Sequence, residues 1–241
     1  MQSETLIFDQ VHLGVPNPEA AAQWYRRYLG ATPGEHADRV MFGQTRCIFL
    51  KNETPAASRG AAIDHVGLSF VDLDAQMKRL EGSGMRVTTP VHAIAGMYTS
   101  GFIEDPWGAR IEVLEDPETM GVHHVHLQVP DPAVSRRWYL EMFGGTPAKL
   151  KGTLDGVRYG DVWLLADRGV SVPSAGHTID HIGWRMPDLL AKASALRTRG
   201  MRFTTEPYPG PEAAHAPVLM SFTEDPSGVK IELLQRRQDP A

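Results

Sequence analysis

The sequence predicts an α+β protein built from four tandem β-α-β-β-β modules. The first observation is a long internal repeat, in which residues 8–33 match residues 122–147 at a constant offset of 114. The second is a shorter repeat that relates 63–75 to 179–191. The third is an alternation of apolar and polar residues at the start of every module, which is typical of β-strands. Because a repeat sets the architecture before any single residue is interpreted, the chain is organised as two similar halves.

Segments rich in proline, glycine and serine separate the modules. They place the modules at residues 6–52, 62–116, 122–168 and 178–235. Grouping consecutive modules gives an N-terminal domain over residues 1–118 and a C-terminal domain over residues 119–241. A chain of 241 residues is long enough to form one large or two modest hydrophobic cores.

Each module is expected to open with a strand and to continue with a helix. The opening strands are predicted at 10–15, 65–70, 124–129 and 181–186. The helices are expected to begin after the N-cap candidates Asn17, Asp72, Asp131 and Asp188, with Pro18 and Pro132 in the first turn. They are expected to end at Gly30, at Gly82 or Gly84, at Gly144 and at Gly200.

Shorter strands complete each module. They are predicted at 40–43, 46–50, 102–104, 110–114, 156–159, 162–165, 219–223 and 230–234. Cys47 is the only cysteine and lies in one of these apolar runs, so a disulfide within the chain is excluded and a buried strand thiol is expected.

Composition excludes several classes of partner. A net charge of −5 gives no electrostatic basis for binding nucleic acid or an anionic membrane. No apolar stretch approaches the roughly 20 residues that cross a bilayer, and the N-terminus does not resemble a secretory signal. A cytoplasmic protein that acts on a small-molecule substrate is therefore expected.

Modules that open with a His-Val-x-Leu pattern and close on Asp-Pro-x-Gly-x-x-Ile-Glu resemble the vicinal oxygen chelate superfamily. This superfamily includes glyoxalase I, extradiol ring-cleaving dioxygenases and the bleomycin resistance proteins. The resemblance covers nearly the whole chain. It implies that the modules pair into two open, cup-shaped mixed sheets with helices outside, and that a divalent metal inside a cup binds the substrate through adjacent oxygens.

The resemblance implies a metal site in the second half of the chain. Its ligands are His124 and His181, on the opening strands of modules three and four, and Glu232, on the last strand. Two imidazoles and one carboxylate suit Fe(II), and Mn(II), Zn(II), Ni(II) or Co(II) also fit. A structural interpretation stays open, in which Glu232 pairs with Arg185 instead.

The alternation of residues along the strands independently predicts that the candidate ligands point into the cup. If Val125 and Leu127 face the helix, His124 and His126 share the opposite face. Glu232 lies between two apolar neighbours on its strand, and a buried carboxylate needs a cation or a metal partner.

The first half offers Gln10, His65 and Glu112 at the corresponding positions. These residues form either a second metal site or a degenerate half that only supports the fold. An amide in place of an imidazole lowers the affinity for a transition metal, although glyoxalase I is similar in using a glutamine there.

Two further histidines are candidates for acid–base catalysis. His126 lies on the same strand face as His124, and His215 lies in the loop 210–217. The family's ring-cleaving enzymes usually carry a tyrosine and a histidine where this chain has Phe222 and Ala166. The family's lyases usually use two carboxylates, yet modules one and three end without a glutamate.

The sequence thus favours a metal-dependent enzyme, with a ring-cleaving or related dioxygenase slightly ahead of a glyoxalase-like lyase or isomerase. A non-catalytic protein that sequesters a drug or metabolite is the alternative from another class. The sequence leaves open whether the halves pair within one chain or exchange partners in a homodimer.

Overall fold

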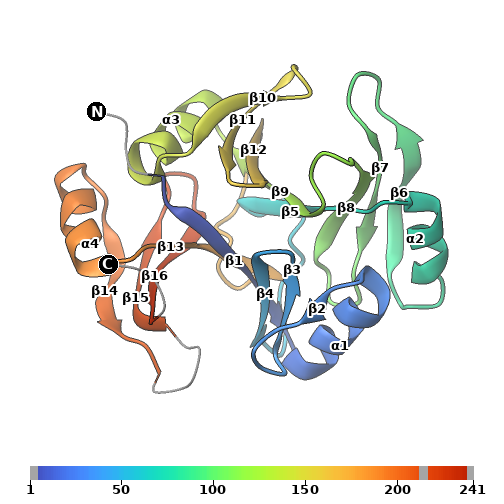
Figure 1. Cartoon of the computed structure of the whole chain (residues 1–241), viewed down its shortest axis with the longest axis horizontal. Helices are drawn as coiled ribbons and strands as arrows, with labels where there is room; N and C mark the ends of the chain where they lie inside the picture. Colours follow the sequence, from blue (N-terminus) through green and yellow to red (C-terminus); the bar gives the residue numbers. More distant parts are fainter. Residues whose placement is uncertain (1–4, 212–216, 238–241) are drawn as a thin grey trace.

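Strand pairing joins the first module to the fourth and the second to the third. The structure is a computed structural model that describes residues 5–211 and 217–237, and it contains two eight-stranded sheets (Figure 1). One sheet has the order β14-β15-β16-β13-β1-β4-β3-β2, and the other has the order β10-β11-β12-β9-β5-β8-β7-β6. We call the first sheet the 1/4 cup and the second the 2/3 cup, after the modules that form them.

Every module has the predicted β-α-β-β-β order. The strands of the 1/4 cup are β1 (Ile7–Val15), β2 (Thr32–Pro33), β3 (Arg39–Phe42), β4 (Thr45–Lys51), β13 (Ile179–Arg185), β14 (Phe203–Pro209), β15 (Pro217–Glu224) and β16 (Lys230–Arg236). Those of the 2/3 cup are β5 (Ile63–Ser69), β6 (Arg86–Ala93), β7 (Thr99–Glu104), β8 (Arg110–Glu115), β9 (Gly121–Val129), β10 (Thr146–Leu150), β11 (Leu154–Tyr159) and β12 (Val162–Arg168). The helices are α1 (Pro18–Leu29), α2 (Leu73–Leu80), α3 (Pro132–Phe143) and α4 (Leu189–Thr198). The predicted α+β fold class is confirmed.

The expectation that modules one and two form one domain, and modules three and four the other, is wrong for the sheets. β1 runs antiparallel to β13, and β5 runs antiparallel to β9. Only five residues, 116–120, connect β8 to β9, so modules two and three stay in one sheet. The longer linkers 52–62 and 169–178 carry the chain from one sheet to the other.

The helices form where the sequence predicted them. Asn17, Asp72, Asp131 and Asp188 are the N-caps, and each side chain accepts a backbone N–H of the first turn. Gly30 ends α1 in the left-handed conformation at φ 73°. No helix in the described ranges is long and apolar enough to cross a membrane.

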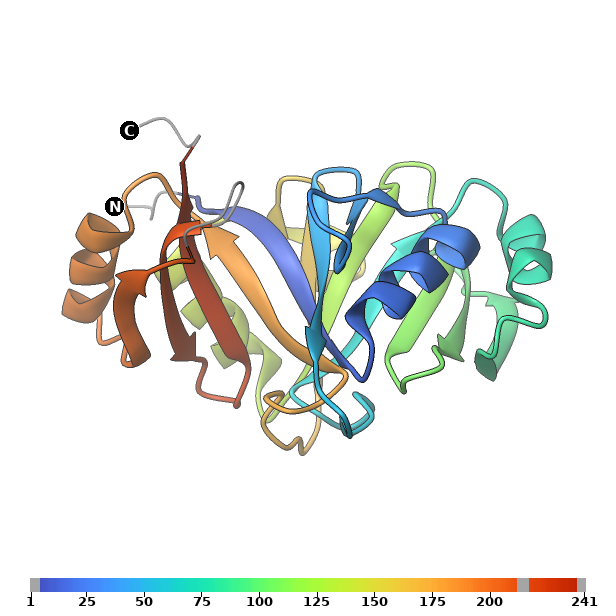
Figure 2. The ribbon, with the colours of Figure 1, turned by 90° about the horizontal axis from the view of Figure 1, so that it is seen from below.

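Modules one and two contact each other through a helix rather than through strand pairing, and so do modules three and four. The Tyr25 hydroxyl of α1 donates to Asp105 in module two at 2.8 Å, and the Tyr139 hydroxyl of α3 donates to Asp225 in module four at 3.1 Å. Helices α2 and α4 lie at the two ends of the molecule (Figure 2). Trp184 is fully buried.

The opening strands divide their side chains between two environments. Val125, Leu127 and Val129 are at most 1% exposed and belong to the main apolar core. Burying such side chains contributes roughly 1.5–3 kcal/mol each. His124 and His126 alternate with them, so the core fixes the strand and directs the histidines to the other face.

Candidate metal centre

Each cup brings histidines from two opening strands close to a glutamate from a closing strand. In the 2/3 cup, Gly67 of β5 lies opposite His124 of β9 and beside Glu112 of β8. A Cβ atom on Gly67 would lie 2.2 Å from Cε1 of the His124 ring. Because glycine has no side chain, the imidazole can lie across β5 and reach toward Glu112.

His65, His124 and Glu112 form the candidate ligand set of the 2/3 cup. Oε2 of Glu112 lies 3.2 Å from Nε2 of His124 and 3.5 Å from Nε2 of His65. The rings of His65, His124 and His126 each offer a nitrogen within 4.8 Å of the others. Among the side chains that the structure describes, Nε2 of His65 and Nε2 of His124 are buried without a hydrogen-bond partner. A bound cation would satisfy them, so the residues fit a metal ion.

The other ring nitrogen, Nδ1, of both His65 and His124 already contacts a neighbouring side chain. Nδ1 of His65 donates to Oδ1 of Asp64 at 2.7 Å, and Nδ1 of His124 lies 2.8 Å from Nδ1 of His123. A carboxylate only accepts, so His65 carries a proton on Nδ1 and can offer a metal only Nε2. Against the effect of burial, Asp64 and Glu112 raise the pKa of His65, so binding a metal at Nε2 releases a proton from this ring. Metal-binding histidines are usually held in this way, by a carboxylate or another acceptor behind the ring.

The electrostatics of the site favour a cation. Burial lowers the pKa of His124 to about 3, so this ring is neutral at pH 7. Burial alone would raise the pKa of Glu112, but the adjacent rings of His124 and His65 hold it far below its usual range. An ionised carboxylate beside a neutral imidazole is the protonation state that a divalent metal requires.

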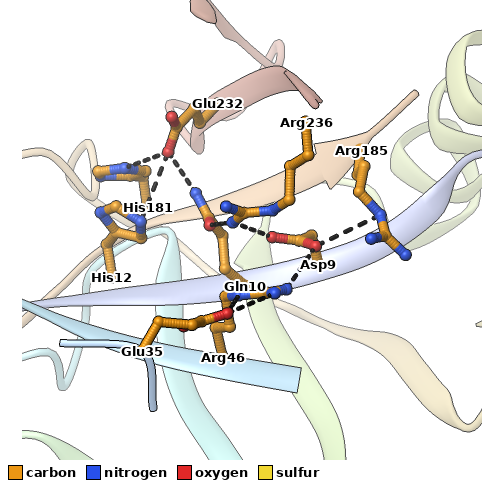
Figure 3. Close-up of polar contacts among 9 residues, drawn as sticks. All are labelled: Asp9, Gln10, His12, Glu35, Arg46, His181, Arg185, Glu232 and Arg236. Carbon is orange, nitrogen blue, oxygen red and sulfur yellow. Dashed lines mark hydrogen bonds and ion pairs between the residues drawn. The ribbon is translucent and has the colours of Figure 1, made fainter. Parts of the chain in front are cut away.

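The 1/4 cup has the same plan with one ligand changed. Oε2 of Glu232 lies 3.4 Å from Nε2 of His181 and 3.5 Å from Nε2 of His12 (Figure 3). Nδ1 of His181 donates to Asp180 at 2.5 Å, which leaves Nε2 as the lone pair. His12, His181 and Glu232 also have ligand atoms within 4.8 Å of one another. Gln10 takes the place that His124 has in the other cup.

The amide of Gln10 is turned away from metal binding. Arg236 donates to Oε1 of Gln10 at 3.0 Å, and Nε2 of Gln10 donates to Glu232 at 2.5 Å (Figure 3). An amide NH₂ group has no lone pair to offer a metal, and here it occupies an oxygen of the only carboxylate in the set. The 1/4 cup therefore presents a poorer ligand set than the 2/3 cup.

The two predicted ligand sets are divided between the cups. His124 lies in the 2/3 cup, whereas His181 and Glu232 lie in the 1/4 cup. His65 and Glu112 share the 2/3 cup with His124, and Gln10 lies in the other cup. Grouping His124 with His181 was wrong because β9 pairs with β5 and not with β13.

The two predicted acid–base residues have different outcomes. His126 lies in the 2/3 cup, with Nε2 at 3.3 Å from Oδ2 of Asp167. Burial lowers the pKa of His126, and Asp167 opposes this shift. His215 lies outside the described residues. Arg185, considered as a partner of Glu232, lies 3.5 Å from Asp9.

A cavity of about 200 Å³ opens beside the ligands of the 2/3 cup, and its lining includes His65, Glu112, His126, Phe102 and Arg110. The Arg110 guanidinium lies 4.0 Å from the centre of the Phe102 ring, and it also pairs with Asp64. This space lies directly next to the candidate ligands.

An apolar wall follows the ligands on β12. Trp163 pairs with His124 and Leu165 pairs with His126 across the parallel β9–β12 register. These two side chains form a separate apolar cluster with Leu150, against which Met97 and Tyr98 pack. The positions on β12 next to the two histidines therefore carry no carboxylate.

Several residues of the site were missed by sequence reasoning, namely Asp64, Asp180, His123, Asp116 and Asp167. Asp64 and Asp180 had a detectable signal, because an aspartate directly precedes the opening-strand histidine in both copies of the Ile-Asp-His motif. His123 adjoins His124 in the sequence, but its role depends on Asp116. Asp116 and Asp167 are brought near by strand pairing, and their spacing in the sequence gives no comparable signal.

Comparisons with known proteins agree with this architecture. The family model for the Glyoxalase/Bleomycin resistance protein/Dioxygenase superfamily matches residues 7–113 and 121–233. A Synechocystis protein named "Probable lactoylglutathione lyase" is 27% identical over 124 residues, which cover 46% of this chain and 92% of that protein. The crystal structure of glyoxalase I from Zea mays superposes with a TM-score of 0.77 at 17% identity, covering 96% of this chain and 92% of that one. The chain therefore belongs to the Glyoxalase/Bleomycin resistance protein/Dioxygenase superfamily.

Proposed function

We propose that the protein is a divalent-metal-dependent enzyme whose active site is the 2/3 cup. The observation that carries the proposal is the convergence of His65, His124 and Glu112, with both Nε2 lone pairs directed at one buried carboxylate. Two imidazoles and one carboxylate leave coordination positions open for other ligands and are typical of non-haem Fe(II) sites. Mn(II), Zn(II), Ni(II) and Co(II) fit the same donors.

When bound, the metal would supply a Lewis acid that two adjacent oxygens of a substrate can chelate. The chain itself supplies the surroundings. Arg110 and Phe102 line the cavity beside the ligands. Trp163 and Leu165 form an apolar cluster on β12, next to His124 and His126. His126, backed by Asp167, is the group that accepts or returns a proton.

The ligand set favours the reaction of a ring-cleaving or related dioxygenase. The set contains one carboxylate, Glu112, and the neighbouring positions on β12 are Trp163 and Leu165. An apolar cluster beside the candidate ligands suits a small oxygenated molecule with an apolar or aromatic body.

A glyoxalase-like lyase or isomerase is the second candidate. The 27% identity to the Synechocystis protein named for lactoylglutathione lyase favours it. In that case the proton transfer runs through His126, because the cup holds no second glutamate at the β12 positions.

Metal content tests the site. The purified protein is loaded anaerobically with Fe(II), desalted and analysed for metal per chain, in parallel with Glu112→Gln and Glu232→Gln. We expect about one ion per chain in the wild type, loss of that ion in Glu112→Gln and its retention in Glu232→Gln. Retention in Glu112→Gln would exclude the 2/3 cup as the metal site.

Substrate assays then separate the two reactions. Oxygen consumption with a panel of catechols indicates the dioxygenase, and formation of lactoylglutathione from methylglyoxal and glutathione indicates the lyase. Glu112→Gln serves as the inactive control in both assays. A protein that binds a small molecule tightly but is inactive in both assays would instead be a sequestering protein.

A further inference from the structure

The His124 ring depends on two buried neighbours outside the ligand set. His123, the preceding residue on β9, and Asp116, just after β8, are 0% and 1% exposed. Nδ1 of His123 lies 2.8 Å from Nδ1 of His124, and Nε2 of His123 lies 3.2 Å from Oδ2 of Asp116. The ammonium of Lys151, in the β10–β11 turn, donates to Asp116 at 2.9 Å. Asp116, His123 and His124 therefore form a continuous chain of contacts that ends at Glu112.

This chain determines where the protons lie. Asp116 accepts, so His123 carries its proton on Nε2 and presents a lone pair on Nδ1. That lone pair accepts the proton on Nδ1 of His124, which leaves Nε2 of His124 as a lone pair facing Glu112.

The equivalent positions of the 1/4 cup carry the opposite polarity. The repeats align Asp9 with His123, Gln10 with His124 and Arg236 with Asp116. Arg236 donates to Oδ2 of Asp9 at 2.7 Å and to Oε1 of Gln10 at 3.0 Å. A donor therefore stands where the 2/3 cup has an acceptor, and the Gln10 amide responds by directing its NH₂ group at Glu232.

We propose that His123 and Asp116 are positioning residues that hold His124 in its metal-binding tautomer, whereas Asp9 and Arg236 hold Gln10 in an orientation that does not bind metal. The inference rests on the proposed metal site in the 2/3 cup. These pairs decide which of two similar cups takes the metal, although neither pair touches the metal or the substrate.

The metal-free protein gives the first test. Long-range proton–nitrogen NMR spectra of ¹⁵N-histidine-labelled, EDTA-treated protein report which ring nitrogen carries the proton, and His124→Gln assigns the signals. We expect His124 to be protonated on Nδ1 and His123 on Nε2. A His124 protonated on Nε2 would overturn the inference. This measurement decides the point even if the wild type binds no metal, in which case only the proposed function fails.

Metal affinity gives the second test, measured by competition with a chromophoric chelator for Co(II). His123→Leu removes the acceptor, and we expect a 10–100-fold weaker affinity, the usual effect of losing a residue behind a metal-bound histidine. His123→Asn places a carbonyl oxygen near the position of Nδ1, and we expect it to restore most of the affinity. Val125→Ala, on the core side of β9, is the matched control that lowers thermal stability without changing the affinity.

The two variants also separate positioning from simple packing. Equal affinity in the wild type and in a folded His123→Leu protein would overturn the inference. Equal losses in His123→Leu, His123→Asn and Val125→Ala would assign the effect to packing and overturn it as well. If His123→Leu does not fold, His123→Asn is compared with Asp116→Leu instead. We expect His123→Asn, which keeps an acceptor for His124, to bind Co(II) tightly, and Asp116→Leu, which removes the acceptor for His123, to bind it more weakly.

Discussion

At the scale of single residues, the two cups differ in one pair that faces the cavity. His126 in the 2/3 cup has Asp167 at 3.3 Å, on β12. His12 has the same position in the 1/4 cup, where its neighbour on β4 is Ile48 and Leu50 stands two residues further along. The carboxylate that Asp167 on β12 places beside His126 therefore has no counterpart on β4.

This difference predicts an unequal response to the same substitution. His126→Asn should lower kcat by roughly 10²–10⁴-fold, the usual effect of losing an acid–base group, while metal content stays at the wild-type level. His12→Asn is the control and should leave kcat unchanged. Steady-state kinetics together with metal analysis check the prediction, and an equal loss in both variants would contradict it.

Asp105 lies at the junction of modules one and two, and its buried carboxyl group makes the stability of the fold depend on pH. Burial raises the pKa of Asp105 from 3.8 to about 6, and the hydrogen bonds from Ala109 and Tyr25 offset this only in part. The folded state therefore binds the proton more tightly than the unfolded state. The stabilising contribution is complete below pH 4 and is lost as the pH rises through 6.

Asp105→Asn replaces the titrating carboxyl group by an amide that stays neutral at every pH tested. The amide oxygen can still accept hydrogen bonds from the backbone N–H groups. Relative to the wild type, the variant should gain unfolding free energy between pH 4 and pH 7, by at most about 3 kcal/mol at 1.4 kcal/mol per pKa unit. Urea unfolding at several pH values measures the difference. A difference that is constant over this range, or that shrinks as the pH rises, would contradict the assignment.

At the scale of strands, a glycine on the neighbouring strand leaves space for a side chain to lie across that strand. Gly67 leaves room for the His124 ring, and Gly183 leaves room for Gln10, whose Cγ would lie 2.8 Å from an added Cβ. The contact at Gly67 is with a rigid ring that is also held by His123. The contact at Gly183 is with a flexible side chain.

Gly67→Ala is therefore expected to displace the His124 ring and to weaken metal binding by at least about 10-fold, comparable to losing a ligand-supporting residue. Gly183→Ala is the matched control and should leave the metal in place, because Gln10 can adjust by rotation. Metal titration of both folded variants decides the matter, and tight binding by Gly67→Ala would show that the ring does not need this space.

The same strands show what the sequence could and could not reveal. The alternation around Val125 and Leu127 predicted correctly that His124 and His126 face away from the core, because burial of one strand face is a local property. The partner of β9 is not a local property. The opening strands of the repeats are so similar that either β5 or β13 satisfies the same pattern, and only the short 116–120 linker distinguishes them.

For the same reason, residues that support the ligands from another part of the chain escaped prediction. His123 adjoins His124 in the sequence, yet its role depends on Asp116, which the pairing of β5 with both β8 and β9 brings near. Asp167 reaches His126 only through the β9–β12 register. Local sequence pattern predicted the fold class and the face on which ligands lie, and strand pairing decided which ligands meet.

At the scale of the whole molecule, each half of the chain contributes to both cups. His65 and Glu112 belong to the first half, whereas His124 belongs to the second. Residues 1–118 and 119–241, produced as separate polypeptides, should therefore each lack the full 2/3 ligand set. An equimolar mixture should recover about one metal ion per pair of fragments, as measured after size-exclusion chromatography.

A first-half fragment that alone binds metal as tightly as the intact chain would contradict this arrangement. The Glu112→Gln version of that fragment, mixed with the second half, is the control for correct reassembly. It should form the same complex without binding the ion.

The crosswise pairing also bears on how the two cups came to differ. Had the protein been two copies of one two-module chain, any substitution would have appeared in both cups at once, and a glutamine in place of a metal-binding histidine would have removed both sites together. Joining the copies into a single polypeptide removes that constraint. The 1/4 cup can then carry Gln10, held by Arg236, in place of a metal-binding histidine. The 2/3 cup, formed by the other copy of each repeat, keeps His124.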